Sequence, residues 1–177
     1  GVQAVVPHGV DVARFHPATD RSAAWAATGF PGRYGIAAVG RIRPEKGTDL
    51  FVRAMIRALP QLPGATALAI GMAKGGDAAF LDRLKAEVAA AGLTGRILFP
   101  GEIAPDRMPA LLQGCRLLMA LPRYEGYGLT PLEAMASGAP VIATNTGHFA
   151  EFVGDTAGII VPLQNDATAA LAADAAV

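Results

Sequence analysis

The sequence predicts an α/β domain with one parallel sheet, and three observations support this. Short apolar runs alternate with amphipathic segments along the chain, which is the order expected when helices connect parallel strands. The apolar runs are nearly continuous, as in strands that are buried on both faces of a sheet. Hydrophobic residues make up 52% and charged residues 17% of the 177 residues, so the chain can bury a full-sized core. We expect one Rossmann-like three-layer domain over residues 1–177, with a parallel sheet of about six strands.

Each element follows from a local pattern. The predicted strands are short apolar runs: Tyr34–Gly40, Ala65–Gly71, Arg96–Phe99, Leu117–Leu121, Pro140–Thr144 and Gly158–Val161. The predicted helices follow these strands: Thr48–Leu59, Phe80–Ala91, Asp106–Gln113, Thr130–Ser137, His148–Val153 and an alanine-rich segment after Asn165. Thr48 is a candidate N-cap, and Gly92 and Gly138 end two helices. Residues 2–6 also suggest a strand already inside a fold, so we expect the whole protein to begin upstream.

Composition excludes several classes of protein. Lys plus Arg and Asp plus Glu total 15 each, so no general basic field exists to attract nucleic acid or an anionic membrane. No apolar stretch reaches the roughly 18 residues of a membrane span, and residues 1–9 do not resemble a signal peptide. The glycine-rich fingerprints of dinucleotide sites and P-loops are absent. Cys115 is the only cysteine; it precedes an apolar run, so we expect it to be buried and inert, which suits a reducing cytoplasm.

Two cations flank a proline in the loop directly after the first predicted strand. Arg41 and Lys46 lie within Gly40–Gly47, with Pro44 between them. Ligands of parallel α/β sheets bind beyond the carboxyl ends of the strands, so both cations could face one diphosphate. Charge-assisted hydrogen bonds of this kind are worth roughly 1.5–3 kcal/mol each. Alternatively, both are solvated loop charges with Glu45 as a partner, and spacing alone slightly favours this interpretation.

A glycine-rich turn opens the helix that follows the Leu117–Leu121 strand. Gly126 and Gly128 allow the backbone to approach a ligand closely. The free N–H groups of the helix start, near Leu129 and Thr130, form a natural site for an anion. This turn therefore provides a second candidate contact for a diphosphate.

Two carboxylates belong to the same segment and could accept hydrogen bonds from sugar hydroxyls. Glu133 has a competing structural interpretation, because Thr130 and Glu133 match a capping box with Pro131 at the first helical position. Glu125 lies between an aromatic residue and the glycines, where a functional role is more common, although an ion pair with Arg123 is the alternative.

These segments together resemble the C-terminal domain of family-four retaining glycosyltransferases, which have the GT-B fold. Glu125 and Glu133 form the E-x7-E pattern of that family, and Gly40–Gly47 resembles its phosphate loop. Other segments match the domain start, the base-pocket strand and the region after the signature helix: Pro7–Asp11 with Phe15 and Pro17, Phe99–Ile103, and Thr144–Gly147 with Glu151. The resemblance covers nearly the whole chain, and the order and spacing of its parts make it specific.

The resemblance implies a role for each candidate residue. Arg41, Lys46 and Glu125 are the implied catalytic group: the cations bind the donor diphosphate in place of a metal ion, and Glu125 holds hydroxyls of the transferred sugar. Glu133 binds the ribose, and backbone groups around Ile103 meet the base. The backbone of the turn and helix start contributes further donor contacts, through Gly126, Tyr127, Gly128, Leu129 and Thr130.

The implied activity is transfer of a hexose from a nucleoside diphosphate-sugar with retention at the anomeric carbon. His8 before Gly9, the segment Met72–Asp77 and Leu129–Pro131 look like the branch that adds mannose to lipopolysaccharide core. GDP-mannose is therefore the favoured donor, with UDP- or ADP-sugars as alternatives, no metal, and a glycan or lipid-linked acceptor bound by an N-terminal domain. We expect a cytoplasmic protein, with the inner face of the bacterial membrane as a possible site.

Two other functions stay open from the sequence. One is another GT-B protein, such as a sugar-nucleotide epimerase, and the other is a module that binds nucleotide-sugars without catalysis. His148 could face the donor cleft, but a capping or solvated histidine fits the sequence equally well, so we assign it no catalytic role.

Overall fold

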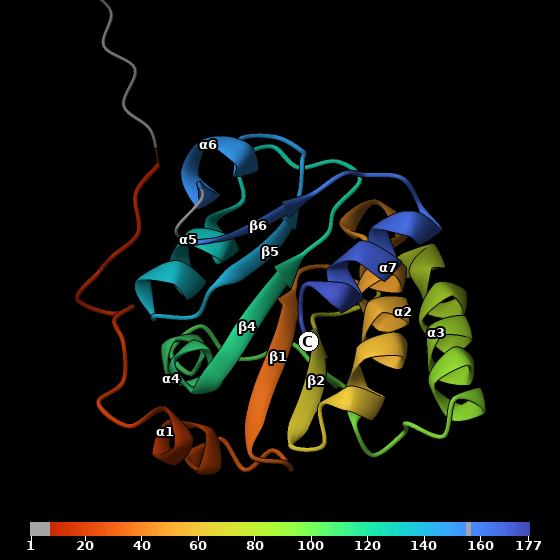
Figure 1. The fold of residues 1–177 in the computed structure, drawn as a ribbon, viewed down its shortest axis with the longest axis horizontal. Helices are drawn as coiled ribbons and strands as arrows, with labels where there is room; N and C mark the ends of the chain where they lie inside the picture. The colour runs from red at the N-terminus through yellow and green to blue at the C-terminus, as the bar shows by residue number, and fades with distance from the viewer. Residues whose placement is uncertain (1–7, 155–156) are drawn as a thin grey trace, which may run out of the picture.

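The structure is a computed structural model that describes residues 8–154 and 157–177. Six parallel strands form one sheet in the order β3-β2-β1-β4-β5-β6 (Figure 1). The strands are β1 (Tyr34–Val39), β2 (Ala65–Ile70), β3 (Ile97–Gly101), β4 (Cys115–Ala120), β5 (Val141–Thr144) and β6 (Gly158–Val161). The expected number and direction of strands are confirmed, while the strand expected near residues 2–6 lies outside the described residues.

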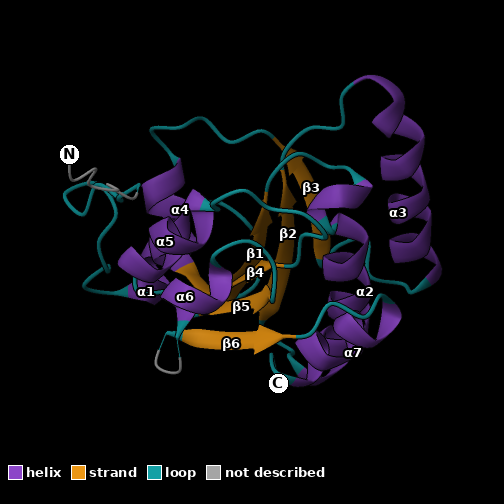
Figure 2. Ribbon diagram, turned by 90° about the horizontal axis from the view of Figure 1, so that it is seen from above, coloured by secondary structure: helices purple, strands orange, loops and turns teal. Residues whose placement is uncertain are grey.

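Helices cover both faces of the sheet and complete three layers (Figure 2). One face carries α2 (Thr48–Ala58), α3 (Ala78–Ala90) and α7 (Asp166–Asp174). The other face carries α1 (Arg21–Ala27), α4 (Met108–Gly114), α5 (Leu129–Ala136) and α6 (Phe149–Val153). The chain therefore has the three-layer arrangement that its sequence predicts.

Burial on both faces explains the nearly continuous apolar strands. Every residue of β2 is buried, and its side chains alternate between the two cores. Ala67 and Ala69 belong to the core beneath α2 and α3, whereas Leu68 and Ile70 belong to the core beneath α1, α4 and α5. A strand with two buried faces has no position for a solvated side chain, so polar residues gather at its ends.

Two differences between the helices and the sequence predictions concern α1 and the start of α2. The first is α1, which no sequence pattern predicted; Asp20 caps it by accepting a hydrogen bond from the Ala23 amide at 3.0 Å, and Trp25 is its buried residue. The second is Thr48, which was expected as the N-cap of α2 but is its first helical residue. Gly47 is the N-cap instead, with a positive φ of 67°, a conformation that glycine adopts without strain.

The order of the strands predicts where a ligand binds. The order reverses between β1 and β4, because the chain continues outward from β1 through β2 to β3 and then returns to the other side of β1. Ligands of such sheets bind at this reversal, beyond the carboxyl ends of the strands. The two loops that start there are the β1–α2 loop and the β4–α5 loop, which carry the cations and the glycine-rich turn.

Cys115 opens β4 and is fully buried. Burial raises the pKa of its thiol to about 12, because the thiolate cannot be solvated there. The expected burial of this thiol is confirmed, and its inertness stays a prediction that the raised pKa supports. No helix in the described residues combines the length and the apolar character that crossing a membrane requires.

Candidate functional site

The β1–α2 and β4–α5 loops meet in an ion pair. Lys46 Nζ lies 2.8 Å from Glu125 Oε2, and the two side chains are only 28% and 19% exposed. The other oxygen of Glu125 accepts a hydrogen bond from the Gly126 amide at 3.0 Å. Two residues that are 79 positions apart in the chain therefore point into one site, at the crevice that the strand order predicts.

Both loops line the same hollow above β1 and β4. Five predicted site residues line it, together with Gly40 and Thr48: Arg41, Lys46, Glu125, Gly128 and Thr130. Below them the hollow is closed by strand residues such as Leu118 and Met119. A cation pair, a carboxylate and a helix start thus face one space, which is the arrangement needed to hold an anion next to a hydroxyl-bearing group.

Arg41 lies between this hollow and a second one. The second hollow has a volume of about 330 Å³ and is lined by both polar and apolar side chains, among them Met72, Lys74, Glu102 and Ile103. Arg41 is exposed, lines both hollows, and has no ion-pair partner within the described ranges. Its guanidinium is therefore free for a ligand that extends from one hollow into the other.

The alternative partner considered for these cations is engaged elsewhere. Glu45 lies 3.8 Å from Arg43 Nε and forms no ion pair with Arg41 or Lys46 in the described part of the chain. The alternative in which Glu45 is the partner of Arg41 and Lys46 is therefore wrong. The charge opposite Lys46 comes instead from the second loop.

The start of α5 is not a capping box. The helix begins at Leu129 with Gly128 as its N-cap, at a φ of 82°, and no side chain caps it. Thr130 lies inside the first turn, so it cannot act as the N-cap partner of Glu133 as the sequence suggested. A side chain at Gly128 would overlap the ring of Phe149, which explains the glycine. The first amides of α5 consequently lack a side-chain cap and are available to a bound anion.

Glu133 is half-buried and stands apart from the two hollows. It is absent from their lining residues, and its pKa is raised above 4.5, mainly because burial disfavours the carboxylate, with Arg14 partly offsetting this. Since capping does not explain this buried carboxyl, its role toward a ribose stays a prediction that rests on the family pattern.

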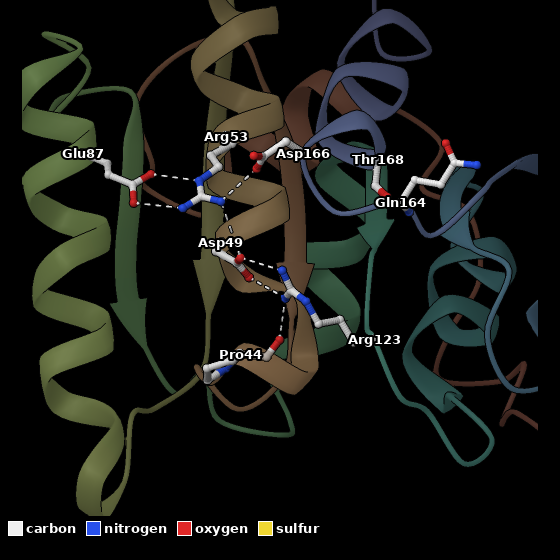
Figure 3. A network of polar contacts seen from close by, with 8 residues as sticks. All are labelled: Pro44, Asp49, Arg53, Glu87, Arg123, Gln164, Asp166 and Thr168. Atoms are coloured by element: carbon white, nitrogen blue, oxygen red, sulfur yellow. Dashed lines mark hydrogen bonds and ion pairs between the residues drawn. The ribbon is translucent and has the colours of Figure 1, made fainter.

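Arg123 pairs with Asp49, not with Glu125. Its two terminal nitrogens each lie 2.7 Å from an Asp49 oxygen, and Asp49 sits in the first turn of α2 (Figure 3). The ion pair that the sequence allowed between Arg123 and Glu125 is therefore not formed. Sequence reasoning missed this contact, because the partners are 74 positions apart and neither lies in a pattern that predicts the other.

Tyr127 anchors the glycine-rich turn from its outer side. Its hydroxyl donates a hydrogen bond to the His8 carbonyl at 2.8 Å, and its ring lies 5.8 Å from the ring of His148. His148 is half-exposed and contacts Glu151 at 3.1 Å. This arrangement gives Tyr127 a role in supporting the turn and gives His148 a local partner.

Comparison with known protein families assigns the chain that carries this site to one of them. The model of the family described as "Glycosyl transferases group 1" matches residues 26–176, which include both loops and both hollows. The chain is a group 1 glycosyltransferase domain. The family and fold that the sequence resemblance predicted are thus confirmed.

Two curated relatives and one solved structure are similar to this glycosyltransferase domain over most of its length. The lipopolysaccharide core biosynthesis mannosyltransferases LpcC of Rhizobium leguminosarum bv. viciae and LpsB of Rhizobium meliloti (strain 1021) are both 47% identical, over 92% and 84% of this chain. The crystal structure of the C-terminal domain of a group 1 glycosyltransferase (LpcC) from Francisella tularensis is 39% identical, with a TM-score of 0.86 over 94% of this chain and 85% of that one.

The domain spans less than half of its curated relatives, covering 46% of LpcC and 42% of LpsB. A solved relative also carries a nucleotide: Anabaena Alr3699/HepE, in complex with UDP, is 26% identical with a TM-score of 0.78 over 93% of this chain and 45% of that one.

The described residues contain no cluster of side chains typical of a metal site. In residues 8–154 and 157–177, no three His, Cys, Asp or Glu side chains gather closely enough to bind one, and metal independence stays a prediction.

Proposed function

We propose that this domain binds the nucleoside diphosphate-sugar donor of a retaining glycosyltransferase. The observation that carries the proposal is the meeting of Lys46 and Glu125 at 2.8 Å in a hollow that Arg41 and the start of α5 also line. A diphosphate needs cations and amides, and a sugar needs a carboxylate acceptor. The hollow offers all of these within the reach of one small molecule.

The diphosphate is assigned to Arg41, Lys46 and the first amides of α5. Negative charge grows on this group as the bond to the sugar breaks, so cations placed beside it stabilise the transition state more than the ground state. They would supply the stabilisation that a divalent metal ion supplies in other phosphate-transfer sites. In this proposal the leaving group is the nucleoside diphosphate.

The rest of the donor extends to either side of the diphosphate. Glu125 would accept hydrogen bonds from hydroxyls of the transferred hexose, and Glu133 from the ribose. The base would enter the second hollow, where backbone groups near Ile103 face it. Arg41 lines both hollows, which suits a ligand whose phosphates lie between its sugar and its base.

Mannose is the favoured sugar and GDP-mannose the favoured donor. The support is the 47% identity to two lipopolysaccharide core mannosyltransferases, together with the segments near His8 and Leu129 that pointed to that branch. The acceptor would be a glycan or a lipopolysaccharide core bound largely outside this domain. A reaction with such an acceptor would take place in the cytoplasm, at the inner face of the membrane.

Calorimetry against a panel of nucleoside diphosphates and their sugars tests this proposal. We expect saturable binding of at least one diphosphate, with GDP strongest and its mannose conjugate competing for the same site. Addition of EDTA should leave the affinity unchanged, since no metal ion takes part. Absence of binding to every member of the panel would contradict the proposed function.

A further inference from the structure

A second ion pair, made of two hydrogen bonds, joins the β4–α5 loop to the start of α2. Arg123 Nη1 and Nη2 lie 2.7 Å from Asp49 Oδ1 and Oδ2, respectively. The Arg123 and Asp49 side chains are 30% and 10% exposed. This two-bond geometry fixes both the distance and the angle between the β4–α5 loop and the first turn of α2.

Arg123 also holds the turn that carries Lys46. The same Nη1 donates a hydrogen bond to the Pro44 carbonyl at 2.6 Å, and the Arg123 amide donates to the Glu45 carbonyl at 2.8 Å. Pro44, Glu45 and Lys46 form one 3₁₀ turn, so Arg123 binds two of the three carbonyls of that turn. Figure 3 shows the contact with Pro44. Lys46 is the last residue of this turn and directly follows Glu45.

The backbones of the two loops touch as well. A side chain at Gly47 would overlap the carbonyl oxygen of Leu121, so the turn and the end of β4 pack directly on each other. Moving either loop would break this backbone contact as well as the hydrogen bonds of Arg123.

The Arg123 guanidinium keeps its charge, because the hydrogen bond to Asp49 raises the pKa of Arg123 further.

We propose that Arg123 and Asp49 are positioning residues that hold Lys46 and Glu125 at the separation needed to bind the donor. Neither lines the hollow, so each acts through its neighbours: Arg123 lies two positions from Glu125, and Asp49 three positions from Lys46. The inference rests on the proposed function of the hollow. Because misplacing binding groups by about 1 Å can cost a hundredfold in rate, a fixed spacing between the loops matters for function.

The same network contains a matched control that touches neither loop. The control is Glu87 on α3, which pairs with Arg53 on α2 at 3.2 Å. Arg53 also pairs with Asp166 on α7, at 3.1 Å, and more distantly with Asp49, at 3.8 Å. Removing the Glu87 charge breaks a two-bonded arginine pair of comparable kind, but it removes none of the hydrogen bonds that Arg123 makes to Asp49 and Pro44. A purely structural network would respond to both changes in the same way.

The test compares Asp49→Asn and Arg123→Gln with Glu87→Gln, all in the same chain. The first measurement is the rate at which acetic anhydride modifies Lys46, followed by peptide mass spectrometry. We expect this rate to rise roughly threefold or more in Asp49→Asn and Arg123→Gln, because Lys46 loses its fixed carboxylate partner, and to stay at the parent value in Glu87→Gln.

The second measurement is the dissociation constant for GDP. It should rise about tenfold in Asp49→Asn and Arg123→Gln and stay within about twofold in Glu87→Gln, while urea unfolding shows how much stability each variant loses. Asp49→Asn preserves the shape of the side chain, so this variant alone tests the positioning role if Arg123→Gln fails to fold. Lys46 reactivity and GDP affinity that match Glu87→Gln in both variants would overturn the proposal. A parent chain that binds no nucleoside diphosphate refutes the proposed function, whereas Lys46 reactivity still tests the positioning.

Discussion

Lys46 connects the two loops of the site, because it lies in the β1–α2 loop and pairs with Glu125 of the β4–α5 loop. Lys46→Ala should weaken nucleoside diphosphate binding by roughly 1.5–3 kcal/mol, about tenfold to a hundredfold, since one charge-assisted contact is lost. Calorimetry measures the change. Lys85→Ala is the control, because Lys85 is exposed on α3 and lines neither hollow.

Glu125 should behave differently from Lys46 although the two are paired. Glu125→Ala removes an acceptor for the sugar but no contact to the diphosphate, so we expect transfer to fall more than diphosphate affinity. Equal loss of diphosphate affinity in both variants would mean that the pair acts only as a structural contact.

The half-buried carboxyl of Glu133 makes stability depend on pH. Its pKa in the folded chain is raised above the ordinary value of 4.5 by burial, so the folded chain binds a proton more tightly there than the unfolded chain does. Stability therefore falls as pH rises from 4.5 towards the raised pKa, and the loss is complete above it. Glu133→Gln should remove this dependence, and urea unfolding of both chains between pH 4 and 7, about the range in which carboxyl groups titrate, measures it. A constant difference between the two curves would contradict the assignment.

At the scale of elements, glycines decide how closely the loops approach. Gly47 caps α2 with a φ of 67°, and an added side chain would meet the backbone of Leu121. Gly47→Ala should destabilise the chain by about 1–3 kcal/mol from backbone strain, with a further loss from the overlap and weaker diphosphate binding. Urea unfolding and calorimetry measure the two effects.

Gly75→Ala separates strain from overlap. Gly75 also has a positive φ, of 60°, but nothing lies within 4 Å of an added side chain. This variant should lose only the stability due to strain and should keep its affinity for a diphosphate. If both glycine variants behave alike, the contact with Leu121 has no influence on the site.

Sequence patterns predicted the elements that bury long apolar runs and missed those that depend on distant partners. The six described strands followed from continuous apolar segments, and the two loops followed from the polar residues at their ends. The helix α1 was missed because it has seven residues and one buried side chain, Trp25, too few for a periodic pattern.

The sequence placed Lys46 and Glu125 in one site but did not predict their contact. Lys46 and Glu125 were both expected there, yet their direct contact depends on how two distant loops pack. Thr130 and Glu133 matched a capping box by local spacing, but the N-cap falls on Gly128, because Phe149 from a later helix packs against that glycine. Tertiary packing thus overrode a local preference.

At the scale of the whole molecule, the domain carries the proposed donor site and spans less than half the length of its curated relatives. We expect these 177 residues to bind a nucleoside diphosphate while transferring sugar slowly or not at all, because the acceptor is not held against the donor. Release of nucleoside diphosphate from a nucleotide-sugar, with and without acceptor, measures this. Rapid transfer by this chain alone would show that the acceptor site lies within it.

The single thiol of the chain gives the protein an internal reporter of unfolding. Cys115 is closed off in the middle of the sheet with a pKa of about 12, so a reagent that attacks exposed thiolates should leave the native chain unlabelled. Labelling can then proceed only through molecules in which β4 has separated from its neighbours. The labelling rate should fall when a ligand binds the folded chain tightly, which allows ligands to be screened without an engineered probe or an enzymatic assay.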